Sequence, residues 1–85
     1  DTTNAEAWNF KGYLQGFNRQ HEQGLLSFSR GIQLNPNSDS LWVGKCMMLL
    51  NLEKYTEALH AAEMAMEIDS TNRAAHFYRV VALFC

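Results

Sequence analysis

Three side chains in the second half of the chain have types and a spacing that could hold a metal ion. His60, Glu63 and Glu67 follow one another at intervals of three and four, so on a helix they share one face. An imidazole and two carboxylates can bind zinc, but such a set on a single helix is usually a solvated polar face. His21 and His76 stand elsewhere along the chain and complete no ligand set. We therefore predict no metal site and no cofactor.

Cysteine chemistry is limited to Cys46 and Cys85. Two cysteines so far apart cannot form the disulfide framework of a small secreted domain, so we expect a reducing, intracellular setting. The sequence has no Gly-x-Ser-x-Gly motif, no glycine-rich phosphate loop, and no cysteine and histidine placed to act together in covalent catalysis. We predict that the chain is not an enzyme.

Composition and charge disfavour two classes of partner. The 85 residues include seven Lys and Arg and nine Asp and Glu, for a formal net charge of −2. The basic residues are scattered singly, whereas a nucleic-acid surface needs a basic stripe or patch. No stretch approaches the roughly 18 apolar residues needed to span a bilayer. With 47% hydrophobic residues to build a core, we predict one small domain, residues 1–85, that neither binds nucleic acid nor inserts into a membrane.

A phrase near the start of the chain occurs three times at one regular interval. The segments DTTNAEAW, NPNSDSLW and DSTNRAAH each run from small polar residues to a ring, which places Trp8, Trp42 and His76 in register. Repeats of about 34 residues are typical of stacked arrays, because one unit is too small to bury its own apolar face. The chain begins without Met and ends inside the apolar run VVALFC, so we expect a fragment of a longer protein.

Two rows of aligned side chains follow from this register. A tryptophan that recurs at the repeat interval, as Trp8 and Trp42 do, is predicted to pack within the array. Three residues after each ring stand Lys11, Lys45 and Arg79. Their stems are expected to cover helix faces while their charges reach water.

The apolar spacing within each unit is helical. Apolar residues recur at intervals of three and four, with polar residues on the opposite side. Asn4, Ser38 and Asn72 are predicted helix N-caps, and Pro36 is predicted to end the helix before it. The expected helices span 5–17, 22–34, 39–51, 55–68 and 73–85.

The chain resembles the tetratricopeptide-repeat family, whose unit is a helix–turn–helix of about 34 residues. The residues that carry the resemblance are AEAW at 5–8, LNPNS at 34–38, YTEAL at 55–59 and EIDS at 67–70. It implies an all-α superhelix (α-α solenoid) of stacked antiparallel hairpins, five helices in all. Repeat one would cover about 5–38, repeat two about 39–72, and the first helix of repeat three about 73–85.

Two glycines depart from the family's pattern. Gly24 and Gly31 stand where the pattern expects a small Ala. A glycine in a helix interior costs about 0.5–1 kcal/mol relative to alanine. We therefore expect the first repeat to be less stable than the second.

The first helices of units two and three are apolar on nearly every side, and such helices must be covered by something. At the repeat spacing, one set of positions forms a continuous surface, and the resemblance implies that this surface lines the concave groove. The groove residues predicted in this way are Asn9, Tyr13, Phe17, Val43, Met47, Leu50, Phe77 and Val81.

Two roles for this surface remain open from the sequence. One is a protein-interaction scaffold whose apolar and aromatic groove takes a peptide or helix of a partner protein. The other is a structural or self-assembly module, in which further repeats or a symmetric copy cover the groove and the chain forms homo-oligomers.

The resemblance also predicts what does not bind. Chaperone-binding members of the family clamp a pair of carboxylates with basic and amide side chains. The matching positions here are Asn9, Tyr13, Gly44, Ala74 and Tyr78. None of them is basic, so we expect no binding of a double-carboxylate ligand from a heat-shock chaperone.

Overall fold

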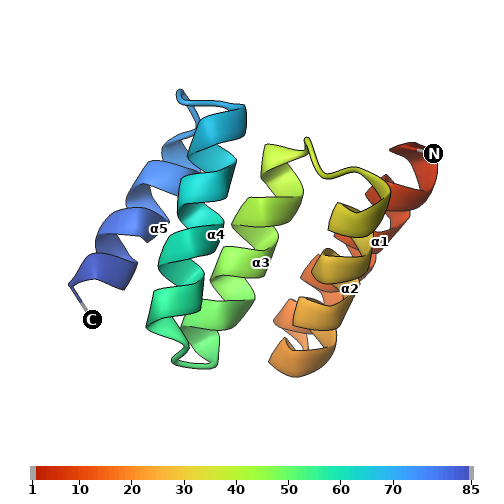
Figure 1. Cartoon of the computed structure of the whole chain (residues 1–85). Helices are drawn as coiled ribbons and strands as arrows, with labels where there is room; N and C mark the ends of the chain where they lie inside the picture. The colour runs from red at the N-terminus through yellow and green to blue at the C-terminus, as the bar shows by residue number, and fades with distance from the viewer. Residues whose placement is uncertain (1, 85) are drawn as a thin grey trace.

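The computed structural model describes residues 2–84 and shows five antiparallel helices in sequence order (Figure 1). No strand occurs in this part of the chain. The all-α class and the five predicted helices are thereby confirmed. The helices are α1 (Thr2–Phe17), α2 (His21–Leu34), α3 (Asp39–Asn51), α4 (Tyr55–Ile68) and α5 (Arg73–Leu83).

Two of the three predicted N-caps are confirmed. The Ser38 hydroxyl accepts a hydrogen bond from the amide of Leu41 at 3.4 Å, and the Asn72 side chain accepts one from the amide of Ala75 at 3.0 Å. Both bonds satisfy amides that the first helical turn leaves unpaired. The prediction for Asn4 is wrong, because α1 begins at Thr2 and Asn4 lies inside it.

The helices form an inner and an outer layer. α1 packs on α2 and α3 packs on α4, while α1, α3 and α5 also contact one another in sequence order. Within the described residues, α2 and α4 share no contact although both pack on α3. We call the layer of touching helices, α1, α3 and α5, the inner layer, and the layer of α2 and α4 the outer layer.

The turns between α1 and α2 and between α3 and α4 have the same backbone conformation. Arg19 and Glu53, which stand one repeat interval apart, have φ angles of 62° and 61°. The amide following each, on Gln20 or Lys54, donates to the carbonyl five residues earlier at 2.8 or 2.9 Å. This is the pattern of a helix ending in a left-handed residue, here without glycine. The repeat in sequence is thus also a repeat in turn geometry.

The centre of the first hairpin is filled by one ring. Phe28 of α2 is fully buried, between Gly12 of α1 and Gly44 of α3. A Cβ added to Gly12 would lie 2.7 Å from the ring, and one added to Gly44 would meet the ring as well. One interval later the corresponding residues are Ala62, Cys46 and Tyr78, so the large side chain has moved from the outer helix to the inner one. Gly12 and Gly44 thus leave the space that the Phe28 ring fills.

Gly24 and Gly31 also allow close packing. A Cβ on Gly24 would lie 2.7 Å from the sulfur of Met48, and a Cβ on Gly31 would lie 2.7 Å from Leu41. The alanines that the family pattern places there would therefore press on these side chains in this chain. Glycine at these two positions lowers helix propensity, but it leaves room for the large side chains of the neighbouring inner helix.

A polar pair replaces an apolar one in the first hairpin. The hydroxyl of Ser27, which is 2% exposed, donates to the Gln15 side-chain oxygen at 2.5 Å. At the corresponding positions the second hairpin has Ala61 and Leu49, both buried. Gln15 thus supplies the hydrogen-bond partner that the buried hydroxyl of Ser27 requires.

Candidate functional site: the inner face

Three of the predicted groove residues form a row across the inner layer. Tyr13, Met47 and Val81 follow one another at the repeat interval and come from α1, α3 and α5. Each is half-buried, so each packs on the array and keeps part of its surface accessible. Because consecutive inner helices touch, the three residues lie on neighbouring helices, and their role as a groove stays a prediction.

Packing from the outer layer fixes the position of Tyr13. Its ring meets Phe28 edge to face, with 5.0 Å between centroids and 80° between planes. Burial raises the pKa of the Tyr13 hydroxyl above its ordinary value, and a hydrogen bond with Ser40 partly offsets the effect. Tyr13 therefore keeps its proton at neutral pH and presents a neutral hydroxyl beside an aromatic edge.

Val43 does not line a surface, and its assignment to the groove is corrected. It is 5% exposed and packs with Ala65 and Ala75. The corresponding residue of the preceding unit, Asn9, also contacts the next inner helix, since its amide donates to the Ser40 hydroxyl of α3 at 3.3 Å. This position faces the next inner helix, which helical spacing alone does not reveal.

The remaining predicted groove residues differ in exposure. Phe77 corresponds to Val43 but is 63% exposed, because no described helix follows α5. Leu50 is half-buried next to the row. Phe17 is 84% exposed and follows Phe10 and Leu14 at spacings of seven and three, so it shares their face at the N-terminal end of the array.

The two tryptophans are half-buried between the layers and covered by cations. The Lys11 and Lys45 ammonium groups lie 5.0 and 5.2 Å from the ring centroids of Trp8 and Trp42. The Trp42 indole donates to the Pro36 carbonyl at 3.1 Å. The lysine stems therefore cover ring faces and gain a cation–π contact, a role that the sequence did not indicate.

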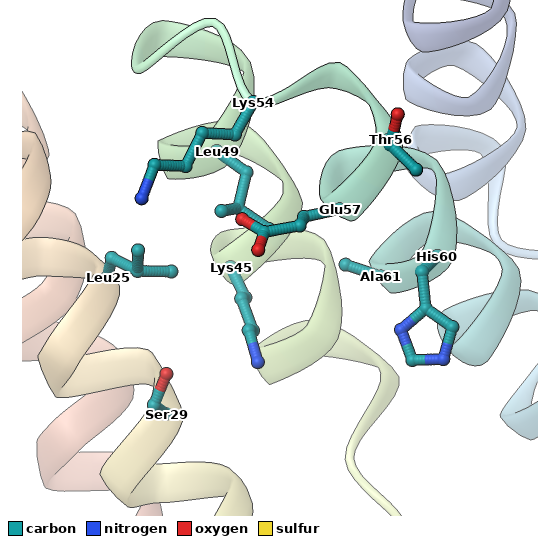
Figure 2. Close-up of a pocket in the computed structure, with 9 residues that line it drawn as sticks. All are labelled: Leu25, Ser29, Lys45, Leu49, Lys54, Thr56, Glu57, His60 and Ala61. Carbon is teal, nitrogen blue, oxygen red and sulfur yellow. The ribbon is translucent and has the colours of Figure 1, made fainter.

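The gap between the outer helices is a pocket of 510 Å³, drawn in Figure 2. Leu49 of α3 lies at its centre, Leu25 of α2 on one side and His60 of α4 on the other (Figure 2). The exposed His60 ring stands edge-on to Trp42, with 6.2 Å between the ring centroids. Among the described residues, no group of three or more His, Cys, Asp or Glu could hold a metal ion.

Cys46 is a packing residue. It is fully buried, and its thiol donates to the Ala58 carbonyl at 3.2 Å. Burial raises the pKa of the thiol from 9.0 to about 11. The thiolate that a nucleophile needs is therefore scarce at neutral pH.

This pKa predicts how Cys46 reacts. In a Cys85→Ser chain at pH 8, iodoacetamide should modify Cys46 only as fast as the protein opens, so adding urea below the unfolding midpoint should accelerate the reaction. A raised pKa favours the neutral thiol in the fold, so its contribution to stability is complete below about pH 9 and lost as pH rises toward 11. Rapid modification without urea, at the rate of a free thiol, would contradict this.

No described helix is both long and apolar enough to cross a membrane.

Comparison with known proteins identifies the fold. The first tetratricopeptide domain of Spaghetti (RPAP3), solved with the HSP90 peptide SRMEEVD, superposes with a TM-score of 0.97 at 18% identity, over 99% of this chain and 67% of that one. The second domain of the same protein gives 0.96 at 22% identity, over 98% and 77%. The Arabidopsis OM64 domain gives 0.94 at 22%, over 95% and 67%. The chain has the tetratricopeptide-repeat fold.

The sequence comparisons are narrower. Human tetratricopeptide repeat protein 33 is 32% identical over 50 residues, which is 59% of this chain and 19% of that protein. The chain therefore matches less than a fifth of the length of this curated relative. No family model matches the sequence.

Proposed function

We propose that the chain is a protein-interaction scaffold, and that its inner face takes the apolar side of a partner peptide or helix. The observation that carries the proposal is the row Tyr13, Met47 and Val81, half-buried on three touching helices. A rigid face of this kind loses little conformational entropy on binding. Met47 adds a flexible, polarisable side chain that can adapt to a partner's shape.

The proposal includes the sequence-based division into repeats at about 5–38, 39–72 and 73–85, and an intracellular setting. It includes no catalysis, which is supported by the burial of Cys46 and by the lack, among the described residues, of a group of three or more His, Cys, Asp or Glu that could hold a metal ion.

Affinity capture with the full-length protein tests the inner face. Met47→Gln with Val81→Gln removes apolar surface from the row while leaving uncharged side chains that half-buried positions tolerate. Leu26→Gln with Leu34→Gln is the matched control, since both leucines are exposed on α2 at 53% and 43%. The inner pair should lose specific partners that the control pair keeps, with helicity by circular dichroism unchanged in both. An identical partner set in all three proteins would overturn the proposal.

The acidic peptide found on the first Spaghetti domain is not the proposed ligand. The positions that would clamp its carboxylates are polar, small or neutral here: Asn9, Tyr13, Gly44, Ala74 and Tyr78. The Phe28 ring moreover fills the space next to Gly44. Calorimetric titration with SRMEEVD should show no binding at millimolar peptide. Micromolar binding would contradict the charge argument.

The structural alternative makes a different prediction about the isolated chain. If the exposed apolar residues serve self-assembly, light scattering should show a stable oligomer whose mass does not fall on dilution. A monomer favours the scaffold.

A further inference from the structure

An apolar stripe on α1 is left uncovered by the residues that the structure describes. Phe10, Leu14 and Phe17 are 67%, 47% and 84% exposed, and their spacing of four and three places them on one face of the helix. Phe17 follows Tyr13 by four residues, so this stripe borders the row proposed to bind a peptide but does not include it. The fold itself shows what covers such a face, because the positions recur in the next two inner helices.

In those helices the positions of Phe10 and Leu14 are covered, whereas Asn51, which corresponds to Phe17 in α3, is exposed. Gly44 and Met48 of α3, which correspond to Phe10 and Leu14, pack against α2. The exposed fraction of Met48 is 2%. The corresponding residues of α5, Tyr78 and Ala82, pack against the alanines of α4. The stripe on α1 is therefore the continuation of an interface that the molecule makes twice.

The two existing interfaces obey a size rule. Where the inner residue is Gly44, the outer helix supplies the large Phe28; where it is Tyr78, the outer helix supplies the small Ala62. Four residues earlier on the outer helix, both interfaces have a small residue, Gly24 or Ala58. The rule follows from close packing, since two large side chains cannot share one position.

We propose that the Phe10, Leu14 and Phe17 stripe docks a partner helix that carries small residues at two positions four apart, as α4 does at Ala58 and Ala62. Phe10 is large, like Tyr78, so the incoming helix must be small where α2 has Phe28. An α2-like helix, with a phenylalanine at that position, is excluded by the same overlap. The proposal is independent of the inner-face function.

A second copy of the folded chain does not supply this helix. The alanine face of α4 is already buried between α3 and α5, where Ala58 and Ala62 are 0% exposed. The small face of α2 is occupied in the same way, with Gly24 against Met48. The other large apolar residues that are exposed do not provide small side chains four residues apart. They are Leu26, Leu34, Phe77, Val80, Leu83 and Phe84.

A synthetic helix tests the proposal on the whole 85-residue chain. The probe has the sequence of residues 54–69, stapled between the positions of Glu63 and Glu67, which are exposed on α4 and four residues apart. The staple is needed because an isolated helix of this length is marginal in water. Titrated into isotope-labelled protein, the probe should shift the backbone amide resonances around Phe10, Leu14 and Phe17 saturably.

Three comparisons make the result specific. A probe with Ala58→Leu and Ala62→Leu should bind roughly tenfold or more weakly, because of overpacking. Phe10→Gln with Leu14→Gln in the protein should abolish the shifts. Phe84→Gln with Leu83→Gln removes one Phe and one Leu, 84% and 49% exposed, at the C-terminal end of α5 and should leave binding unchanged.

Four outcomes would overturn the proposal. They are the absence of binding, equal binding of the leucine probe, shifts centred on α5, and a dimer that the Phe10/Leu14 variant dissociates. The last outcome would assign the stripe to a second copy.

Discussion

Phe28→Ala will lower the free energy of unfolding by about 3–5 kcal/mol, which is most of the stability expected for a domain of this size. The ring is fully buried and touches the neighbouring inner helices at Gly12 and Gly44, so its removal leaves a cavity that glycines cannot fill. Urea unfolding followed by circular dichroism measures the change. Leu26→Ala, at a residue of α2 that is 53% exposed, is the control and should cost less than about 1 kcal/mol.

The same position offers a stricter test. The second hairpin solves the packing problem with Cys46, Ala62 and Tyr78, so Phe28→Ala combined with Gly12→Cys and Gly44→Tyr copies that solution. The triple variant should recover about 2 kcal/mol relative to Phe28→Ala, because the lost volume is returned from the inner helices. A triple variant less stable than Phe28→Ala would show that the two hairpins do not exchange side-chain volume in this way.

Gly44→Ala will destabilise the protein by about 1–3 kcal/mol, although alanine is the better helix former by about 1 kcal/mol. The added methyl overlaps the Phe28 ring, which is fully buried and has no space to move into. In a Phe28→Leu background the same substitution should become neutral or favourable, since the smaller side chain leaves room. Thermal unfolding of the four combinations gives the coupling energy.

Gly16→Ala is the matched control for this effect. It is also in an inner helix, but its added Cβ would meet only the terminal methyl of Met48, at 2.8 Å, and the sulfur next to it. The end of a methionine side chain can move, so helix propensity should dominate and stabilise the protein by up to about 1 kcal/mol. Destabilisation at Gly16 as large as at Gly44 would contradict the role given to the ring.

The helices could be predicted from the sequence because local features, such as apolar spacing and N-cap residues, determine where each one forms. Ser38 and Asn72 cap α3 and α5 as expected, and the starts of α2 to α5 agree with the predicted ones to within one residue. Asn4 failed as a cap because nothing in Thr2–Asn4 interrupts a helix, so α1 extends past it. The unit length and the stacking of hairpins followed from the regular interval between Trp8, Trp42 and His76.

The residues exposed on the inner face were harder to predict. Helical spacing tells on which side of its helix a residue lies, but not which element packs against that side. Asn9, Val43 and Phe77 share one register, yet Val43 is buried by Ala65 and Ala75 while Phe77 is 63% exposed. The difference is whether another inner helix follows. The exchange of Phe28 for Ala62 was visible in the aligned sequence, but its meaning required the contacts of Gly12 and Gly44.

The central claim, that the inner face meets a partner protein, is tested most directly by photo-cross-linking from the full-length protein. Tyr13→p-azidophenylalanine nearly preserves the shape of a side chain at the α1 end of the inner row, and Tyr55→p-azidophenylalanine is a half-buried tyrosine control on α4. The account predicts adducts to a small set of other polypeptides from position 13 that are absent from position 55. Adducts from position 13 that lie only within the chain itself, or match those from position 55, would contradict it.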